Sequence, residues 1–229
     1  YLPHHAVLKD SSSSTKLKTV FDASRPTSTK ISLNDILIVG PTVQPDIFCH
    51  ILKFRIHKIV FIADIEKMYR MIALHPDDWH FTRIVWRFDP SEPMQDYFLT
   101  TVTYGLSNSA FTAIRSLLQL AKDEGPKYPL AKKVVEEDFY VDNLQTGANT
   151  LSEALEIKSQ VQDLLSKGCF PLKKWASNSE AFMKTIPQED REYKLPFELH
   201  KDESIKSLGV QSNPVDDNFI FKSNWELHS

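Results

Sequence analysis

The stretch Phe139-Tyr140-Val141-Asp142-Asn143 decides how the rest of this chain is interpreted, because an apolar strand pattern runs directly into an acidic tip. The upstream stretch Ala63-Asp64-Ile65-Glu66-Lys67-Met68-Tyr69 has the same design, since the continuous apolar run 59–63 ends at Asp64. Hard divalent cations prefer carboxylate oxygens, and phosphoryl transfer uses two such ions about 3.5 to 4 Å apart. Asp64 and Asp142 are therefore candidate ligands from separate segments of the backbone.

Strand and helix patterns surround both acidic tips. Strands are expected over 16–21, 59–63, 82–88, 95–102, 133–141 and 144–146, with a small hairpin over 207–210 and 219–221. One helix is expected over 108–122, and a second begins at Thr150 and Glu153, which have capping-box spacing, and ends at Gly168. This order brings both acidic tips to one face of an antiparallel sheet backed by two helices, which is an α+β fold.

Composition limits the class of protein. The 229 residues are 41% hydrophobic and 25% charged, which predicts a folded chain. There is no apolar run of about 20 residues and no secretory signal pattern, so we expect an intracellular protein. Cys49 and Cys169 are the only cysteines, so neither a disulfide framework nor a zinc ribbon is expected. The start at Tyr1, without Met, suggests an internal piece of a larger product.

The charge distribution leaves the partner open. The net charge of −3 argues against nucleic acid, which usually needs a basic surface. Residues 1–60 nevertheless hold eight Lys and Arg against four Asp, so this segment carries +4 and the remainder −7. A basic N-terminal lobe would suit a nucleic-acid partner, and a simple solvated face would explain the same charges.

A series of sequence blocks resembles the reverse transcriptase domain of Bel/Pao-type long-terminal-repeat retrotransposons, from Tyr1 to about Phe221. The blocks are Tyr1-Leu2-Pro3-His4-His5, Lys16-Leu17-Lys18-Thr19-Val20-Phe21-Asp22-Ala23-Ser24, Ser32-Leu33-Asn34-Asp35, Ala63-Asp64-Ile65-Glu66-Lys67-Met68-Tyr69-Arg70, Thr101-Val102-Thr103-Tyr104-Gly105, Asp138-Phe139-Tyr140-Val141-Asp142, Lys174-Trp175-Ala176-Ser177-Asn178 and Leu208-Gly209-Val210. Their common order over nearly the whole chain is far more specific than any one block.

The resemblance implies a right-hand polymerase fold with fingers and palm, its thumb largely missing. Residues 1–60 would be part of the fingers, and 61–178 the palm with an interleaved fingers hairpin at about 75–102. Residues 179–229 would end the palm and carry a hairpin like the primer grip at Leu208-Gly209. The implied activity is RNA-directed DNA polymerase, acting on an RNA or DNA template with a primer and on deoxynucleoside triphosphates, in the cytoplasm or a virus-like particle. Protease, ribonuclease H and integrase parts are absent from this chain.

The resemblance also implies roles for individual residues. Asp64, Asp142 and Ile65 would hold two Mg²⁺ or Mn²⁺ ions, with Asn143 beside them and Lys174 as a candidate for protonating the leaving pyrophosphate. The residues implied in binding the incoming nucleotide are Lys16 and Lys18 on the triphosphate, Tyr69 as the steric gate that rejects a 2′-hydroxyl, and Tyr104 with Gly105 behind the base.

Asn143 is the departure that matters, because the family has a second aspartate at this place. Asparagine keeps the size and one carbonyl oxygen but removes a negative charge that would help to balance the metal ions. Two readings therefore stay open: a polymerase with impaired activity, and an inactive polymerase fold that only binds nucleic acid or is vestigial. An RNA-directed RNA polymerase is disfavoured by Tyr69.

Each residue also has a plainer explanation. Asp64 alone would serve as a helix cap, Tyr69 as a core aromatic, and Lys16 and Lys18 as solubilising edge residues. The eight histidines show no metal-binding spacing. Three further aromatic residues, Trp86, Phe139 and Trp175, are expected in the core rather than as base-stacking platforms, although any that is exposed could stack on a template.

Overall fold

The computed structural model describes residues 1–8, 17–44 and 46–192, together with the backbone of three short strands between 205 and 220. The chain divides into two compact units. Unit 1 comprises Tyr1–Gln44, Lys67–Glu124 and Lys167–Phe170, and unit 2 comprises Pro45–Glu66, Gly125–Ser166 and Pro171–Ser229. Each unit is built from segments that are distant in the sequence.

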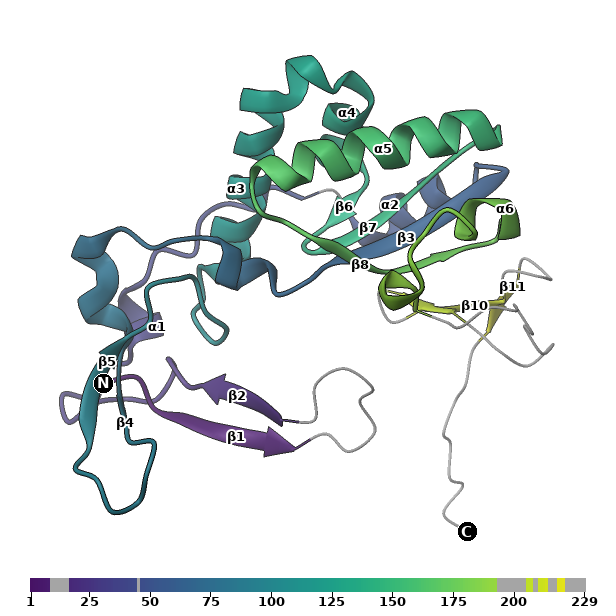
Figure 1. Ribbon diagram of the computed structural model, residues 1–229. Coiled ribbons are helices and arrows are strands. Elements are labelled where there is room, and N and C mark those ends of the chain that lie inside the picture. Colours follow the sequence, from purple (N-terminus) through teal and green to yellow (C-terminus); the bar gives the residue numbers. More distant parts are fainter. Residues whose placement is uncertain (9–16, 45, 193–204, 208–209, 214–217, 221–229) are drawn as a thin grey trace, which may run out of the picture. The chain divides into compact units, whose positions relative to one another are not determined.

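Unit 2 is organised by a four-stranded antiparallel sheet in the order β6-β7-β3-β8 (Figure 1). The strands are β3 (Ile59–Ile65), β6 (Phe139–Tyr140), β7 (Asn143–Ala148) and β8 (Leu172–Ser177). The predicted apolar strand is thus confirmed as the inner strand β3, although only alternate residues along it are fully buried. Strand β8 was not predicted.

The helices of unit 2 are α2 (Ile47–Phe54), α4 (Pro129–Glu137), α5 (Leu151–Lys167) and α6 (Glu180–Met183), with 3-10 turns at Gly125–Lys127 and Gln188–Asp190. Aromatic rings pack α6 onto the sheet. Phe182 stacks on Phe61 with ring centroids 4.6 Å apart, and the fully buried Trp175 lies 6.2 Å from both rings. Truncating a buried aromatic ring typically costs about 3–5 kcal/mol, so these contacts are a main source of stability.

The predicted strand over 133–141 is wrong, because most of it is helix α4. Pro129 occupies the first turn, where its missing N–H costs nothing, and the buried residues Ala131, Val134 and Val135 follow helical spacing. The adjacent β-branched valines suggested a strand, but burial of this helical face outweighs their weak propensity. Only Phe139–Tyr140 is strand.

The predicted helix beginning near Thr150 is confirmed as α5. The Glu153 N–H donates to the Thr150 hydroxyl at 3.3 Å, which is one half of the expected capping box. The reciprocal bond is displaced by one residue, because the Glu153 carboxylate accepts from the Asn149 N–H at 3.3 Å. The helix ends at Lys167, next to Gly168.

Unit 1 holds two antiparallel hairpins and one long helix. Strand β1 (His4–Leu8) pairs with β2 (Leu17–Phe21), and β4 (Arg83–Trp86) pairs with β5 (Gln95–Phe98). Helix α3 (Ser109–Glu124) confirms the helix expected over 108–122, and the short elements are α1 (Leu33–Ile36) and 3-10 turns at Met68–Met71 and Pro76–Thr82. The predicted strand and hairpin are confirmed, while Lys16 lies outside the described residues.

A fourth sheet is described by its backbone. Its antiparallel order is β11-β10-β9, from β9 (Ile205–Ser207), β10 (Val210–Asn213) and β11 (Asn218–Ile220). The sequence predicted only a two-stranded hairpin here, and the block at Leu208-Gly209 lies outside the described residues.

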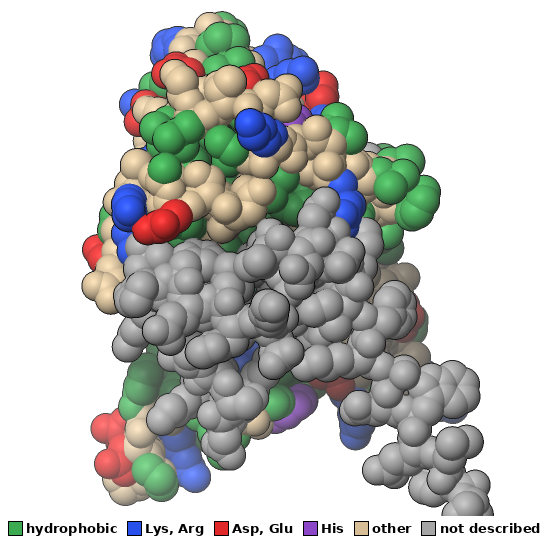
Figure 2. Space-filling view, turned by 90° about the vertical axis from the view of Figure 1, so that its right-hand side faces the viewer, with side chains coloured by type: hydrophobic (Ala, Val, Ile, Leu, Met, Phe, Trp, Pro, Cys, Tyr) green, Lys and Arg blue, Asp and Glu red, His purple; other side chains and the backbone are tan. Residues whose placement is uncertain are grey.

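Solvent exposure differs among the three aromatic residues that were predicted to lie in the core. Phe139 and Trp175 are buried as expected, whereas Trp86 is 46% exposed, so its assignment to the core is wrong. Figure 2 shows one face on which the described basic, acidic and apolar side chains are intermixed. Within the described ranges, none of the helices is both long and apolar enough to cross a bilayer.

Candidate active site

Strand β3 positions Asp64. The residue lies one position before the end of the strand at Ile65, and β3 is paired on both edges, which fixes its backbone. The residue directly opposite Asp64 on β7 is Asn143. The Asp64 side chain keeps 22% of its surface exposed, so it remains accessible at the end of the sheet.

A strained turn positions Asp142. Two residues, Val141 and Asp142, connect β6 to β7, and Val141 has φ +56°. Left-handed backbone is rare for a β-branched side chain and costs of order 1–3 kcal/mol, so surrounding contacts must hold it. One such contact is the Ile65 N–H, which donates to the Asp142 carbonyl at 2.8 Å. The acidic tip is thereby tied to the end of β3.

Burial, the nearby Asp64 carboxylate and the Asn143 amide all act on the carboxyl group of Asp142. Burial raises its pKa above the ordinary value, and the neighbouring Asp64 charge raises it further. The Asn143 side-chain Nδ2 donates to Asp142 Oδ1 at 3.0 Å. Asparagine therefore supplies a donor at a place where a second carboxylate would add repulsion.

Lys174 lies close to Asp64 and comes from β8, which pairs with β3 on the side opposite to β7. It lies on β8, where the pairing with β3 shifts register, and its own φ is +53°. The Lys174 ammonium donates to Asp64 Oδ2 at 2.7 Å, and this bond raises the pKa of Lys174. The structure thus brings together the four residues predicted as catalytic, Asp64, Asp142, Asn143 and Lys174.

The side chains of Asp64 and Asp142 are of the chemical type that binds hard divalent cations. Asp64 and Asp142 offer carboxylate oxygens, which Mg²⁺ and Mn²⁺ prefer. Their joint charge is −2, and the ammonium of Lys174 offsets half of it. Across the described ranges, no group of three or more His, Cys, Asp and Glu side chains is placed to hold a metal. Asn143, beside Asp142, offers an amide side chain rather than a carboxylate.

A hydrogen-bond network around the buried Asp138, below the acidic hairpin, was not found from the sequence. Asp138 is 7% exposed and accepts from the Lys53 ammonium at 2.7 Å and from the Thr146 hydroxyl at 2.7 Å. Lys53 lies on α2 and also pairs with Glu137 at 2.6 Å. The network joins α2, the end of α4 and β7 at the base of the hairpin. No local signal marks it, because its partners are separated by up to 85 residues.

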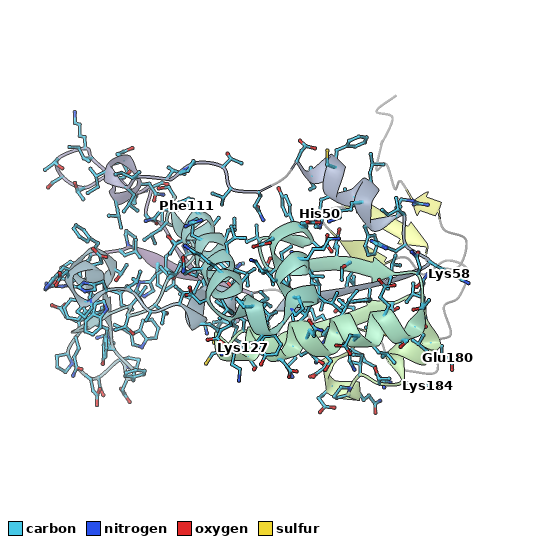
Figure 3. The ribbon with its side chains drawn as sticks, turned by 90° about the horizontal axis from the view of Figure 1, so that it is seen from above. His50, Lys58, Phe111, Lys127, Glu180 and Lys184 are labelled. Carbon is cyan, nitrogen blue, oxygen red and sulfur yellow. The ribbon has the colours of Figure 1, made fainter. Side chains whose placement is uncertain are left out.

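His50 lies beside this network on α2 (Figure 3). It is 3% exposed, its ring lies 6.2 Å from that of Tyr140, and its Nε2 has no hydrogen-bond partner. Burial lowers the pKa of His50 below its ordinary value. His50 therefore packs α2 against β6 as a neutral ring.

Unit 1 brings together four of the residues predicted to bind the nucleotide. The Lys18 ammonium lies 4.6 Å from the centroid of the Tyr104 ring, and the Tyr69 ring meets that of Tyr104 edge to face at 4.8 Å. Gly105 follows at φ +93°, and a Cβ there would lie 2.1 Å from the Phe21 carbonyl oxygen, so this position requires glycine.

Asn34 holds the loop that carries these residues, and its role was not predicted. Its Nδ2 donates to the Gly105 carbonyl at 3.0 Å, and its Oδ1 accepts from the Ser107 N–H at 2.8 Å. The sequence offered Asn34 only as part of a family block. Tertiary contact across 71 residues gives it this function.

Solved structures with a similar arrangement include foamy viral protease-reverse transcriptase bound to an RNA/DNA hybrid (TM-score 0.53, 20% identity, 73% of this chain and 19% of that chain). A second is foamy viral protease-reverse transcriptase dRH with double-stranded DNA (TM-score 0.61, 18% identity, 93% of this chain and 30% of that chain). The chain has a reverse transcriptase-like fold. A third structure, the native prototype foamy virus protease-reverse transcriptase, agrees (TM-score 0.53, 16% identity, 73% and 19% covered).

The reverse transcriptase-like fold rests on structure, since no protein-family model and no curated protein matches the chain. The chain spans between 19% and 30% of the length of these three proteins. Within this fold, the α+β expectation is confirmed in its coarse form.

Proposed function

We propose that this chain is the reverse transcriptase domain of a Bel/Pao-type retrotransposon polyprotein, with fingers and palm, that transfers nucleotides to a primer 3′-hydroxyl. Its activity is weakened by Asn143. The observation that carries the proposal is the convergence of Asp64 and Asp142 at one end of the β3 and β6–β7 strands, with Lys174 bonded to Asp64.

In this proposal Asp64, Asp142 and the Ile65 carbonyl would hold two Mg²⁺ or Mn²⁺ ions, which would supply positive charge next to the primer hydroxyl and the leaving pyrophosphate. Lys174 carries a proton on Nζ next to Asp64, which suits it to donate to, or electrostatically stabilise, the departing phosphates. Asn143 orients the Asp142 carboxylate through its amide N–H. The strained Val141 turn limits the freedom of that carboxylate.

The unit 1 cluster has a separate role in nucleotide choice. Lys18, whose ammonium lies over the Tyr104 ring, binds triphosphate oxygens, and Tyr69 excludes a 2′-hydroxyl. Gly105 has no side chain, so its backbone can lie close to the base of the incoming nucleotide. Competition between deoxynucleotides and ribonucleotides tests this assignment. Equal incorporation of both would contradict a gate at Tyr69.

The proposed partner is an RNA or DNA template with its primer. The support is that two of the similar solved structures are complexes, one with an RNA/DNA hybrid and one with double-stranded DNA. Contacts of Lys and Arg with phosphates predict binding that weakens as the salt concentration rises.

The rival function is a polymerase fold that binds nucleic acid without catalysis. Two observations favour it: Asn143 removes a carboxylate, and Lys174 already compensates Asp64. The lower net negative charge of this site would attract a metal ion less strongly. Metal-dependent extension separates the two functions, because both would bind nucleic acid.

The test is primer extension on an RNA template with Mg²⁺ or Mn²⁺, comparing the chain with Asn143→Asp. We expect extension by both, with Mn²⁺ more effective than Mg²⁺ in the parent chain and a gain on the order of tenfold or more in the variant. Asp64→Asn in the Asn143→Asp background is the matched control and should abolish extension.

Mn²⁺ binding by electron paramagnetic resonance gives a second readout that needs no turnover. We expect Asn143→Asp to bind Mn²⁺ more tightly than the parent. If the parent does not extend while the variant does, the rival function is correct for this chain. Absence of Mn²⁺ binding and extension in both proteins would overturn the polymerase proposal.

A further inference from the structure

Strand β8 carries two consecutive lysines, Lys173 and Lys174, beside the end of β3 where Asp64 lies. In the pairing of these strands, Ile62 lies opposite Ala176 and Asp64 lies opposite Lys173, so β8 has one more residue than β3 between the two pairs. An extra residue of this kind is a β-bulge, and Lys174 belongs to it, with left-handed backbone at φ +53°. Bulges beside a functional site change the direction in which side chains point.

Both lysines lie on the face of the sheet that carries Asp64. Lys173 shares this face because directly opposite residues of an antiparallel pair lie on the same side. Lys174 shares it as well, since its ammonium reaches Asp64, while the next residue, Trp175, is buried beside Phe61 on the other face. In a regular strand, consecutive side chains alternate between the two faces. The bulge therefore places two ammonium groups on the side of one carboxylate.

The two lysines have different partners. The Lys174 ammonium donates to Asp64 Oδ2 at 2.7 Å. The Lys173 ammonium instead donates to the carboxylate of Asp190, with which it forms an ion pair. The Asp190 side chain is only 16% exposed, so this pair is less screened by water than a fully exposed one. The lysine directly opposite Asp64 is thus held by another acid.

Backbone contacts along the outer edge of β8 fix the position of Asp190. The Asp190 N–H donates to the Pro187 carbonyl at 3.0 Å, which closes a 3-10 turn. The next residue, Arg191, forms a parallel bridge with Trp175, and the Glu192 N–H donates to the Trp175 carbonyl at 3.0 Å. These contacts hold Asp190 beside Lys173.

We infer that Asp190 is a positioning residue of the acidic site: by binding Lys173, it keeps a second ammonium away from Asp64 and Asp142. These two carboxylates carry −2 and Lys174 carries +1, so the three side chains have a net charge of −1. A second ammonium would bring this charge to zero and remove the attraction for a divalent cation. The inference deepens the proposed function, on which it rests for the cation.

The first test needs no metal. The full chain is treated with a water-soluble carbodiimide, which joins an amine to a carboxylate in contact with it, and the links are mapped by tandem mass spectrometry. In the parent we expect links from Lys173 to Asp190 and from Lys174 to Asp64. In Asp190→Asn we expect a new link from Lys173 to Asp64 or Asp142. A link from Lys173 to Asp64 in the parent would already contradict the inference, without any variant.

The matched control is Glu180→Gln, which removes the same charge from an exposed ion pair with Lys184 at 2.9 Å in the same unit. It should leave the links of Lys173 unchanged. Glu66 is the other carboxylate near Lys173. If Asp190→Asn shows a new link to Glu66 alone, or no new link, the inference is wrong.

Mn²⁺ binding, measured by electron paramagnetic resonance in the Asn143→Asp background, gives the second readout. Asp190→Asn should weaken Mn²⁺ binding about tenfold, because the freed ammonium lies close to the cation. Adding Lys173→Met to Asp190→Asn should restore the affinity, and Asp190→Glu should keep it. A loss that Lys173→Met does not restore would show that Asp190 acts only on the fold, and would overturn the inference.

The two readouts separate this inference from the proposed function. If the links move as expected but neither the parent nor Asn143→Asp binds Mn²⁺ or extends a primer, the polymerase proposal is refuted and the control of Lys173 by Asp190 stands. If the chain binds Mn²⁺ and extends a primer while Asp190→Asn changes neither the links nor the affinity, the polymerase proposal stands and the inference fails.

Discussion

The hairpins β6–β7 and β4–β5 are both antiparallel, but the segments that connect their strands differ in length and exposure. Two residues connect β6 to β7, one of them Val141 in left-handed backbone. Residues 87–94 connect β4 to β5, and all of them are exposed. The first hairpin also has a buried network at its base, through Asp138. The difference teaches that a short strained turn with hydrogen bonds at its base fixes the position of a carboxylate, whereas a long exposed connection carries its side chains with few such constraints.

The largest expected effect concerns catalysis. In the Asn143→Asp background, Asp142→Asn should lower the rate of primer extension on the order of 10²- to 10³-fold, because it removes preorganised charge at the reacting atoms. Trp86→Ala in the same background should cost less than about tenfold at saturating template. Single-turnover extension measures both. Equal losses would break the distinction between the two hairpins.

The next effect concerns the network at the base of β6–β7. Asp138→Asn should lower the free energy of unfolding by about 2–3 kcal/mol, because the buried side chain loses its charge and one of its two acceptor oxygens becomes a donor that faces Lys53 or Thr146. Urea denaturation measures it. Lys132→Ala is the control: its pair with Glu136 at 3.9 Å is exposed, and its loss should cost less than about 0.5 kcal/mol.

The strained turn gives a stabilising prediction. Val141→Asn should raise the free energy of unfolding by about 1 kcal/mol, because asparagine tolerates left-handed backbone and valine does not. Val85→Asn, in the regular strand β4, should lower it by a similar amount because strand propensity and packing are lost. Thermal melts of both variants test whether strain is confined to the acidic hairpin. A destabilised Val141→Asn would show that packing of Val141 outweighs its strain.

The smallest effect is a pH dependence arising beside β6. His50 has a lowered pKa in the folded state, so below about pH 6.5 the unfolded chain binds a proton that the folded chain does not. Its contribution to stability is therefore fully present above that pH and is lost as pH falls. We expect a loss of about 0.5–1 kcal/mol between pH 6.5 and 5.5, below the limit of about 1.4 for one proton.

His50→Gln should flatten this part of the stability profile, whereas His5→Gln, at an exposed position on the β1–β2 hairpin, should leave it unchanged. Denaturation at several pH values gives the comparison. If the free energy of unfolding of His50→Gln depends on pH as steeply as that of the parent, another group is responsible for the titration.

Local patterns predicted some elements well and others poorly. The apolar run of β3, the capped helix α5 and the acidic hairpin were predictable because each has a pattern of its own length and period. Helix α4 was mistaken for a strand because Val134 and Val135 have high strand propensity, while the burial that selects a helix is a tertiary effect. Trp86 was assigned to the core on hydrophobicity, which says nothing about whether a partner strand covers it.

The sequence by itself determined the two acidic tips, their strand context and the presence of Asn143 directly after Asp142, since these are properties of single segments. Only the tertiary structure decided that Asn143 lies opposite Asp64, that Lys174 neutralises Asp64, and that Asp138 anchors the hairpin through Lys53. The physical reason is distance along the chain. Charges and hydrogen-bond donors that are 80 or more residues apart become neighbours only when the sheet forms, and their pKa values and bonds depend on that neighbourhood.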